Sequence, residues 1–539
     1  MGTLRTMQPI TEVARELGLR DDDVEPYGRT MAKVSLRALD DPPRGVGRLV
    51  LVSAINPTPA GEGKTTTSIA LGMGMRRLGK RPVVALRQPS LGPIFGMKGG
   101  GTGGGRATLE PSDGINVHFT GDIHAISSAH NLLSALVDNA IHWRDRIGGS
   151  EVDPRTVTWS RVLDSNDRFL RNCVIGLGGK AHGVPREEGF DITAASEVMA
   201  IVALSRDRAD LEARLGRIVV ASTYEGAPVT AADLPAPGAM AALLRNALVP
   251  NLVQTAEGGP AFVHAGPFAN IAHGCSSIMA TRMAMGLGDY VITEGGFGFD
   301  LGGEKFLDIK CRAAGIWPRA VVLVVTLRAL EAQGGLDHLD KHLESIAAYG
   351  LPAVVALNSF HDDSKEAVGS LATAMASRGV AFAAHDGYAR GGEGATELAR
   401  TVCDVADRTD SSPPAARFLY PLDMPPEEKA RTIARTIYGA RDVVFTPRAR
   451  ADLARFKALG GDLLPVCFAK THLSLSDDPK ALGRPRDFVV TVREVRLSAG
   501  AGLLVALAGD IMTMPGLPRE PASRRIRLGD DGRIVGLGG

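Results

Sequence analysis

The chain has few aromatic residues, no excess of charge of either sign and no long apolar run. Aromatic residues make up 5% of the 539 positions, and 61 Lys and Arg residues are balanced by 60 Asp and Glu residues. This balance provides no basic surface for nucleic acid or anionic lipid, so we expect a small ligand held in a site. No apolar run approaches the ~20 residues that a membrane helix needs, so we do not expect an integral membrane protein.

Cysteine is also scarce, and its spacing excludes the common metal and redox motifs. The five cysteines are widely separated, odd in number and contain no C-x-x-C pair. Residues 1–17 carry charges throughout and lack the apolar core of a secretory signal. These features predict reduced, mostly buried thiols in a cytoplasmic protein.

Glycine, in contrast, is abundant. The 64 glycines indicate many turns and close backbone approaches, which are typical of an α/β protein with several ligand loops. At roughly 150 residues per domain, this length predicts several domains. We place them at residues 1–330, with 110–290 as a possible separate lobe, then 331–445 and 446–539.

One segment, NPTPAGEGKTTT at residues 56–67, predicts a phosphate-binding loop. It follows an apolar strand pattern at 48–55 and precedes a helical pattern at 65–78, and a second strand is expected at 82–86. Such a loop lets backbone N–H groups approach an anion at a helix N-terminus. The usual motif has Gly where this chain has Thr58, so an ordinary Gly-rich turn is the alternative.

In this interpretation, Lys64 reaches the β- and γ-phosphates and Thr65 holds Mg²⁺. The residues predicted to bind the nucleotide are Thr58, Gly61, Glu62, Gly63, Lys64, Thr65 and Thr66.

Two further segments are candidate ligand contacts. The glycine-rich run at 96–106 cannot form a stable helix or strand, so we expect a mobile loop, either a linker or a flap in which Lys98 and Arg106 face phosphates. Residues 115–124 predict a strand and turn, followed by a helix at 125–142. Asp122 in that turn is either a cation or substrate contact or a helix cap. The His118, His124 and His130 spacing matches no common zinc motif.

Several apolar strands alternate with helices later in the chain, at 289–294, 320–326 and 353–357. The first ends at Glu294, beside a Gly-rich turn that leads to Asp300. Acids at the carboxyl ends of such strands lie near Mg²⁺ and phosphates in α/β sheets, although either acid can simply brace its loop. The whole pattern predicts an α/β fold with a P-loop NTPase-like, mostly parallel sheet and additional α/β domains.

Eight ordered motifs resemble formate–tetrahydrofolate ligases, also called formyltetrahydrofolate synthetases. They are TPAGEGKTTT (58–67), PSLGP (89–93), HFTGDIHAI (118–126), PNLVQT (250–255), GPFANIAHGC (266–275), EKFLDIKCR (304–312), KTHLSLSDDP (470–479) and SAGAGLLVALAGDIMTMPGLP (498–518). The resemblance implies ATP-dependent coupling of formate to the N10 amine of tetrahydrofolate. It also implies a cytosolic homotetramer stimulated by a monovalent cation, K⁺ or NH₄⁺.

The chemistry of that reaction assigns further residues. A carboxylate is a poor electrophile, so formate must first become formyl phosphate, which the amine then attacks. Arg87 is the expected ligand of formate and of the acyl phosphate, because a guanidinium holds planar oxyanions with two donors; the alternative is a surface arginine in a salt bridge. For the flat pterin, the resemblance implies an aromatic clamp, and the candidates are Phe360, Tyr388 and Phe297.

Four positions depart from the family pattern near the expected acceptor side. Gln88, Arg106, His361 and Tyr388 stand where the family has Glu, Tyr, Pro and Trp respectively. Gln88 keeps its hydrogen-bonding capacity but cannot act as a base. Two alternatives to the ligase therefore stay open: a divergent relative with an altered acceptor or a regulatory role, and a P-loop switch ATPase resembling the partitioning ATPases and the nitrogenase iron protein.

Overall fold

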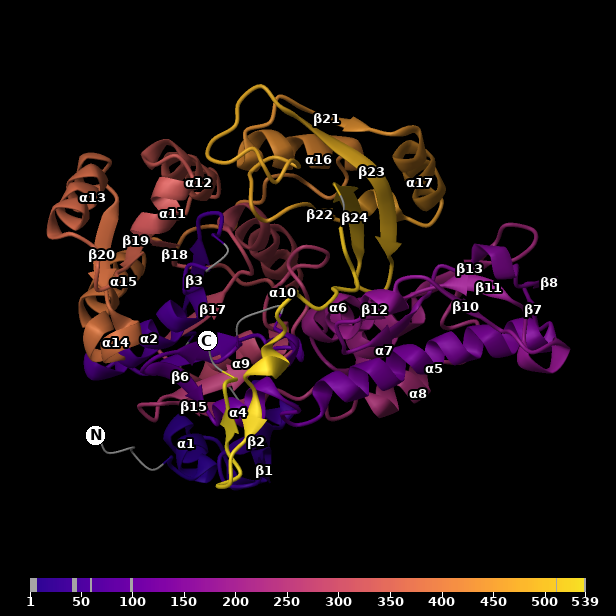
Figure 1. Ribbon diagram of the computed structural model, residues 1–539, viewed down its shortest axis with the longest axis horizontal. Helices are drawn as coiled ribbons and strands as arrows, with labels where there is room; N and C mark the ends of the chain where they lie inside the picture. Colours follow the sequence, from indigo (N-terminus) through magenta and orange to yellow (C-terminus); the bar gives the residue numbers. More distant parts are fainter. Residues whose placement is uncertain (1–6, 41–45, 59–60, 97–99, 510, 538–539) are drawn as a thin grey trace.

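The computed structural model describes residues 7–40, 46–58, 61–96, 100–509 and 511–537. Its centre is a 12-stranded, mostly parallel sheet with helices on both faces (Figure 1). The predicted α/β fold with a mostly parallel sheet is therefore confirmed.

Seven consecutive strands of the sheet run parallel, in the order β16-β4-β17-β3-β18-β19-β20. Their bounds are β16 (Pro260–Val263), β4 (Pro82–Leu86), β17 (Tyr290–Glu294), β3 (Arg48–Ala54), β18 (Ala320–Val325), β19 (Ala353–Asn358) and β20 (Ala381–His385). The antiparallel edge comprises β15 (Asn251–Thr255), β2 (Met31–Val34) and β1 (Val24–Tyr27), and β6 (Ala107–Glu110) with β5 (Gly103–Gly104) extends from β15. Parallel strands that are covered on both faces are mostly apolar, and several polar residues of these strands, Thr293, Glu294, Asn358 and His385 among them, lie at or near the carboxyl ends.

The two faces of β3 illustrate why the sheet needs helices on both sides. Val50 and Val52 pack into one apolar cluster, which includes residues of α2 (Lys64–Arg77) and α15 (Thr396–Arg408). Leu49 and Leu51 belong to another, with residues of α9 (Ile278–Leu287) and α12 (Leu336–Ala348). Successive side chains of a strand point to opposite faces, so both layers are required to bury them.

A second lobe extends from the sheet along the long helix α5 (Figure 1). Its helices are α5 (Asp122–Trp143), α6 (Glu197–Leu204), α7 (Arg208–Gly216) and α8 (Pro237–Leu243), and its short strands are β7 (Arg146–Ile147), β8 (Ser150–Glu151), β9 (Arg161–Leu163), β10 (Cys173–Ile175), β11 (Arg186–Glu188), β12 (Phe190–Ile192), β13 (Val219–Ser222) and β14 (Pro228–Thr230). These elements share an apolar cluster with part of the C-terminal sheet.

The C-terminal region forms a four-stranded sheet in the order β21-β23-β24-β22, drawn in orange and yellow in Figure 1. Its elements are α16 (Pro426–Ile433), β21 (Asp442–Phe445), α17 (Pro447–Lys457), β22 (Val466–Ala469), β23 (Val489–Ser498) and β24 (Leu503–Ala508), and the chain then ends in a hairpin of β25 (Arg527–Leu528) and β26 (Ile534–Val535). The hairpin returns to the first part of the chain, where the Ile534 N–H donates to Asp113 in α4 (Ser112–Asn116). The remaining helices are α1 (Ile10–Leu17), α3 (Gly92–Phe95), α10 (Arg312–Ala314), α11 (Leu327–Ala332), α13 (Lys365–Ser377) and α14 (Gly387–Arg390).

Two local predictions were wrong. No strand occupies 115–124, because α4 ends at Asn116 and α5 already begins at Asp122. The glycine run was expected to form no strand, yet Gly103 and Gly104 pair with β6. In both places tertiary contacts override local propensity, since β6 gives the glycines a partner strand.

Other expectations on composition agree with the structure. All five cysteines are free thiols, and four of them are buried. Within the described parts of the chain, no helix has both the length and the apolar character needed to cross a membrane.

A glycine in α2 provides a test of how tightly the sheet and its helices pack. A Cβ added at Gly74 would lie 2.7 Å from the backbone oxygen of Ala395, whereas nothing lies within 4 Å of a Cβ added at Gly369 in α13. We expect Gly74→Ala to destabilise the protein by about 1–3 kcal/mol, because the neighbouring backbone must move. Gly369→Ala should stabilise it by about 0.5–1 kcal/mol, since alanine favours a helix. Thermal unfolding midpoints of the two variants would check both expectations. Equal shifts would contradict the close approach of the Ala395 backbone to Gly74.

Candidate active site

The predicted phosphate-binding loop lies at the carboxyl end of β3 and leads directly into α2. Gly61 and Gly63 both have positive φ, at 76° and 74°. A Cβ at Gly63 would lie 2.5 Å from the Asn358 Nδ2 atom, so the position needs glycine for space as well as for conformation. In the described structure α2 has no side-chain cap at its N-terminus, which leaves its first N–H groups for an anion.

Three adjacent strands bring the predicted charged residues together. β17 lies between β3 and β4, so Glu294 at its end is next to both the loop after β3 and Arg87 after β4. The Thr65 hydroxyl donates to Glu294 Oε2 at 2.9 Å, and Arg87 Nη2 lies 3.6 Å from Glu294 Oε1. One buried carboxylate thus contacts the loop hydroxyl on one side and the guanidinium on the other.

The electrostatics of Lys64 fit an anion site. Burial lowers the pKa of its ammonium, Glu294 opposes that shift, and the neighbouring Arg87 charge adds to it. Glu62 and Asp300 also oppose the shift, so the two cations lie among several carboxylates. A bound polyanion would favour the charged form of Lys64 as well, because an opposite charge close by raises the pKa of an ammonium.

Arg87 and Gln88 have unused polar atoms. Arg87 Nη1 donates to the Pro267 carbonyl at 3.3 Å, but its Nε is buried without a hydrogen-bond partner among the described residues. Gln88 is 3% exposed, and its Oε1 likewise has no partner there. Buried polar atoms are rarely left unpaired, so both atoms are available to a ligand.

Glu62 is part of the loop, but its carboxylate is used to brace it. One oxygen accepts from the N–H and hydroxyl of Thr58, at 2.7 and 3.0 Å, and the other accepts from the Thr326 hydroxyl at 2.6 Å. Asn358 also donates to the Glu62 carbonyl. Thr58 therefore contributes by shaping the loop through Glu62. Thr66 is half-buried in the first turn of α2.

Asp122 has different partners from the rest of the predicted metal set. One of its carboxylate oxygens accepts from Lys33 Nζ at 2.6 Å, and the other from Asn251 Nδ2 at 2.7 Å. The pair is buried where β2, β15 and α5 meet. The structure thus brings together Thr65 and Glu294, while the carboxylate of Asp122 joins α5 to the sheet.

Two of the three predicted aromatic residues, Phe360 and Tyr388, follow the ends of neighbouring strands. Phe360 comes after β19 and Tyr388 after β20, and these strands pair in parallel. Both rings are exposed, by 38% and 54%, so both can take a ligand. The Arg328 guanidinium lies over Phe360, 4.5 Å from the ring centroid. Phe297 is half-buried and stacks on His472, with 4.3 Å between centroids.

The last residues of the glycine-rich run at 96–106 pack closely against Tyr388. Gly104 and Gly105 lie against the Tyr388 ring, where added Cβ atoms would come within 3.1 and 2.8 Å of it. The Arg106 N–H donates to the Tyr388 carbonyl at 2.8 Å. This part of the run is therefore the surface on which Tyr388 rests. Lys98 lies outside the described residues.

One residue that the sequence did not indicate, His385, connects the two sides of the site. Its Nδ1 accepts from the Gly387 N–H, so the proton is on Nε2, which lies 3.2 Å from the Thr67 hydroxyl in α2. Burial lowers the pKa of this imidazole to about 4. Only the pairing of β20 with its neighbours reveals this residue, because a lone histidine at the end of a strand carries no signal of its own.

This histidine makes a pH dependence testable. Its folded pKa is depressed, so its contribution to stability is complete above the unfolded value of about 6.5 and is lost as the pH falls towards 4. We expect His385→Gln to lose less stability than the parent between pH 7 and 4.5, by about 1–3 kcal/mol. Thermal midpoints across this range would measure it.

The matched control is His361→Gln, because the His361 side chain is 95% exposed. It should keep the pH dependence of the parent protein. If His385→Gln also kept the parent's pH dependence of stability, the assignment of a neutral, doubly hydrogen-bonded imidazole to His385 would be wrong.

Comparison with known proteins places this chain in a family. The family model for formate–tetrahydrofolate ligase matches residues 2–538. A formate–tetrahydrofolate ligase of Myxococcus xanthus is 61% identical, with 99% of each chain covered, and that of Paracoccus denitrificans is 53% identical, with 98% of this chain and 97% of the relative covered. The corresponding Methylobacterium protein is 52% identical, with 99% and 98% covered. The chain therefore belongs to the formate–tetrahydrofolate ligase family.

Proposed function

We propose that this protein uses ATP to join formate to the N10 amine of tetrahydrofolate, producing 10-formyltetrahydrofolate, ADP and phosphate. The observation that carries the proposal is the contact of Glu294 with both Thr65 and Arg87, beside Lys64 at the N-terminus of α2. A phosphate-binding loop and an oxyanion-binding guanidinium at one site are what activation of a carboxylate by ATP requires.

The residues present fit a nucleotide triphosphate with Mg²⁺. The uncapped α2 N-terminus and Lys64 suit the phosphates, and the Thr65 hydroxyl and Glu294 carboxylate are oxygen donors of the type that Mg²⁺ prefers. Bound there, Mg²⁺ would neutralise phosphate charge during transfer. Asp122 is left out of this metal set because Lys33 and Asn251 use both of its oxygens.

Arg87 would act in both halves of the reaction. In the first, a formate oxygen bonds to the γ-phosphorus as the bond to the ADP oxygen breaks, forming formyl phosphate. In the second, the N10 amine bonds to the formyl carbon, phosphate leaves and the amine loses a proton. The guanidinium can orient formate first and stabilise the leaving phosphate afterwards. Its Nε atom has no partner in the described structure and would serve as a donor.

Gln88 would orient the acceptor without taking its proton. Its buried Oε1 lacks a partner among the described residues and can accept from an N–H of the substrate. An amide cannot serve as a base at neutral pH, so the proton of the amine must leave by another route. We therefore propose that Gln88 contributes by positioning alone.

The pterin would lie against the exposed rings of Phe360 and Tyr388, with Phe297 nearby as a third candidate contact. Aromatic stacking adds about 0.5–1.5 kcal/mol beyond the burial of apolar area.

Family membership further supports a cytoplasmic homotetramer with a site for K⁺ or NH₄⁺. Light scattering would test the homotetramer, and assays at different concentrations of these salts would test the cation site.

The assay that tests the function gives purified protein Mg-ATP and formate, with and without tetrahydrofolate, and follows ADP and 10-formyl product. We expect formate-dependent ADP release in the presence of tetrahydrofolate, with an equal amount of formylated product. No formate-dependent ADP in either mixture would overturn the proposal. ADP without formylated folate would show that the acceptor differs.

Variants at Arg87 separate its role from nucleotide binding. Arg87→Lys keeps the charge but loses the paired donors, so we expect kcat/KM for formate to fall by about 10²-fold or more, equivalent to about 3 kcal/mol. The KM for ATP should change little. Tyr388→Ala is the matched variant on the acceptor side, and it should raise the KM for tetrahydrofolate instead. Equal losses for both substrates in both variants would contradict this division.

A further inference from the structure

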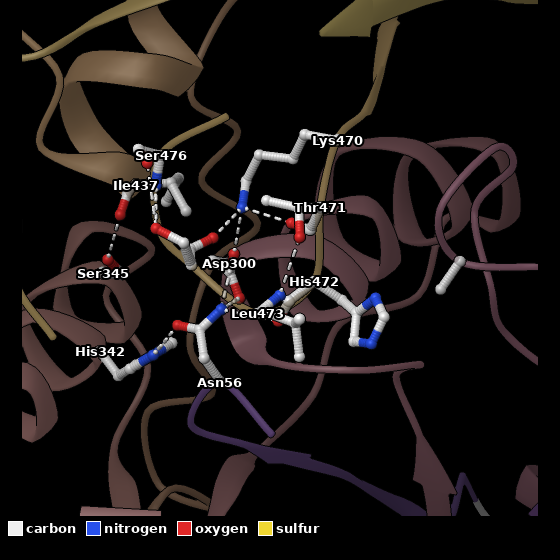
Figure 2. A network of polar contacts seen from close by, with 12 residues as sticks. Asn56, Asp300, His342, Ser345, Ile437, Lys470, Thr471, His472, Leu473 and Ser476 are labelled. Atoms are coloured by element: carbon white, nitrogen blue, oxygen red, sulfur yellow. Dashed lines mark hydrogen bonds and ion pairs between the residues drawn. The ribbon is translucent and has the colours of Figure 1, made fainter. Parts of the chain in front are cut away.

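A buried polar network joins the entrance of the phosphate-binding loop to the C-terminal region (Figure 2). Its members come from four distant parts of the chain: Asn56 after β3, Asp300 in the short π-helix Phe299–Gly303 after β17, His338 and His342 in α12, and Lys470 to His472 after β22. The activity proposed above does not use these side chains. These side chains meet at Asn56, two residues before Thr58, and this arrangement needs a separate explanation.

The centre of the network is an ion pair without access to water. Lys470 Nζ lies 2.9 Å from Asp300 Oδ2, and the two side chains are 0% and 1% exposed. Lys470 also donates to the carbonyls of Thr471 and Ser474. An ion pair at this depth persists only when its remaining hydrogen-bonding capacity is used, and breaking it leaves an unpaired buried charge.

Asn56 is held on every side. Its Nδ2 donates to both oxygens of Asp300 at 3.3 Å and to the His472 carbonyl at 3.1 Å. Its Oδ1 lies 3.1 Å from His342 Nε2. The residue after Asn56 is a proline, and Thr58 follows, so the orientation of Asn56 determines where the backbone enters the loop.

The histidine pair fixes the direction of these bonds. His338 Nδ1 lies 2.8 Å from the Gly483 carbonyl, so it carries the proton and Nε2 is a lone pair. His342 Nε2 is 3.3 Å from that lone pair, so the proton there belongs to His342. The single His342 Nε2–H is therefore shared between the His338 Nε2 lone pair and Asn56 Oδ1, both of which accept, and the Asn56 amide points its N–H groups at Asp300.

The same network reaches the stacked rings. Phe297, which stacks on His472, has a positive φ of 59°, an unusual conformation for a bulky residue. A Cβ at the next residue, Gly298, would lie 2.5 Å from Asp300 Oδ1. Asn56 therefore bonds to the backbone of one partner of this stack, His472, while Asp300 lies close against the residue that follows the other.

We propose that the Asp300–Lys470 pair and His342 are positioning residues for nucleotide binding, acting through Asn56 on the path of the phosphate-binding loop. The inference deepens the proposed function, since it concerns the same ATP site. None of these side chains needs to touch the nucleotide. Its test is equilibrium binding of Mg-ATP, which can be measured even if the protein shows no formate-dependent turnover, so the two proposals can fail separately.

The first test removes a hydrogen-bonding group or a charge of the network. Asn56→Leu keeps the side-chain volume of Asn56 but removes its amide, and His342→Leu removes the N–H that orients Asn56. Lys470→Met leaves Asp300 unpaired. We expect each to weaken Mg-ATP binding by tenfold or more in calorimetric titrations. His342→Gln retains an amide donor and should bind Mg-ATP within threefold of the parent protein.

The matched control is Lys33→Met, which breaks another buried ion pair, the one with Asp122. We expect a lower thermal midpoint, as in Lys470→Met, but Mg-ATP affinity within twofold of the parent. If Lys470→Met does not fold, Asn56→Leu and the His342 pair carry the test, because they remove no charge. Unchanged affinity in Asn56→Leu and His342→Leu would overturn the proposal, and so would an equal loss of affinity in Lys33→Met.

Discussion

The parallel pairing of β4, β17 and β3 is the constraint on which the site depends. Strands that run parallel deliver their carboxyl ends to a single edge of the sheet, where the loops that follow them must meet. Because β17 lies between the other two, Glu294 contacts the phosphate-binding loop and the guanidinium after β4 at once. The site is therefore built by strand order, although its residues lie more than 200 positions apart in the sequence.

That arrangement sets the electrostatic character of the site. Lys64 and Arg87 are both cationic and both lie near Glu294, at the N-terminus of α2. An anion with several oxygens can contact both cations and the helix N-terminus at once, and a low local dielectric strengthens each contact. The buried Arg87 Nε and Gln88 Oε1, which have no partners in the described structure, belong to the two residues that follow β4 in the sequence.

The two sides of the site are also connected mechanically. His385 contacts Thr67 in α2 and accepts from Gly387, immediately before Tyr388, so the loop that carries an exposed ring is tied to the helix that carries Lys64. On the opposite side, Asn56 and Asp300 connect the loop entrance to the Phe297–His472 stack. Both links use buried groups in a single tautomer or orientation, which suits a site where two substrates must meet in register.

Local sequence was sufficient for the elements whose signal is contained in a few neighbouring positions. The apolar run, the glycines and the helical pattern after them predicted a strand, a tight turn and a helix, since strand period, positive φ and helix periodicity are local properties. The sequence alone could not show that Asp122 pairs with Lys33, or that the Glu62 carboxylate accepts from Thr58 and Thr326. It also could not show that Asp300 connects Asn56 to Lys470, which lies more than 400 residues away. Those outcomes depend on which strands pair and which buried charges find partners, and only the tertiary structure decides them, because burial makes an unpaired polar group too costly to leave alone.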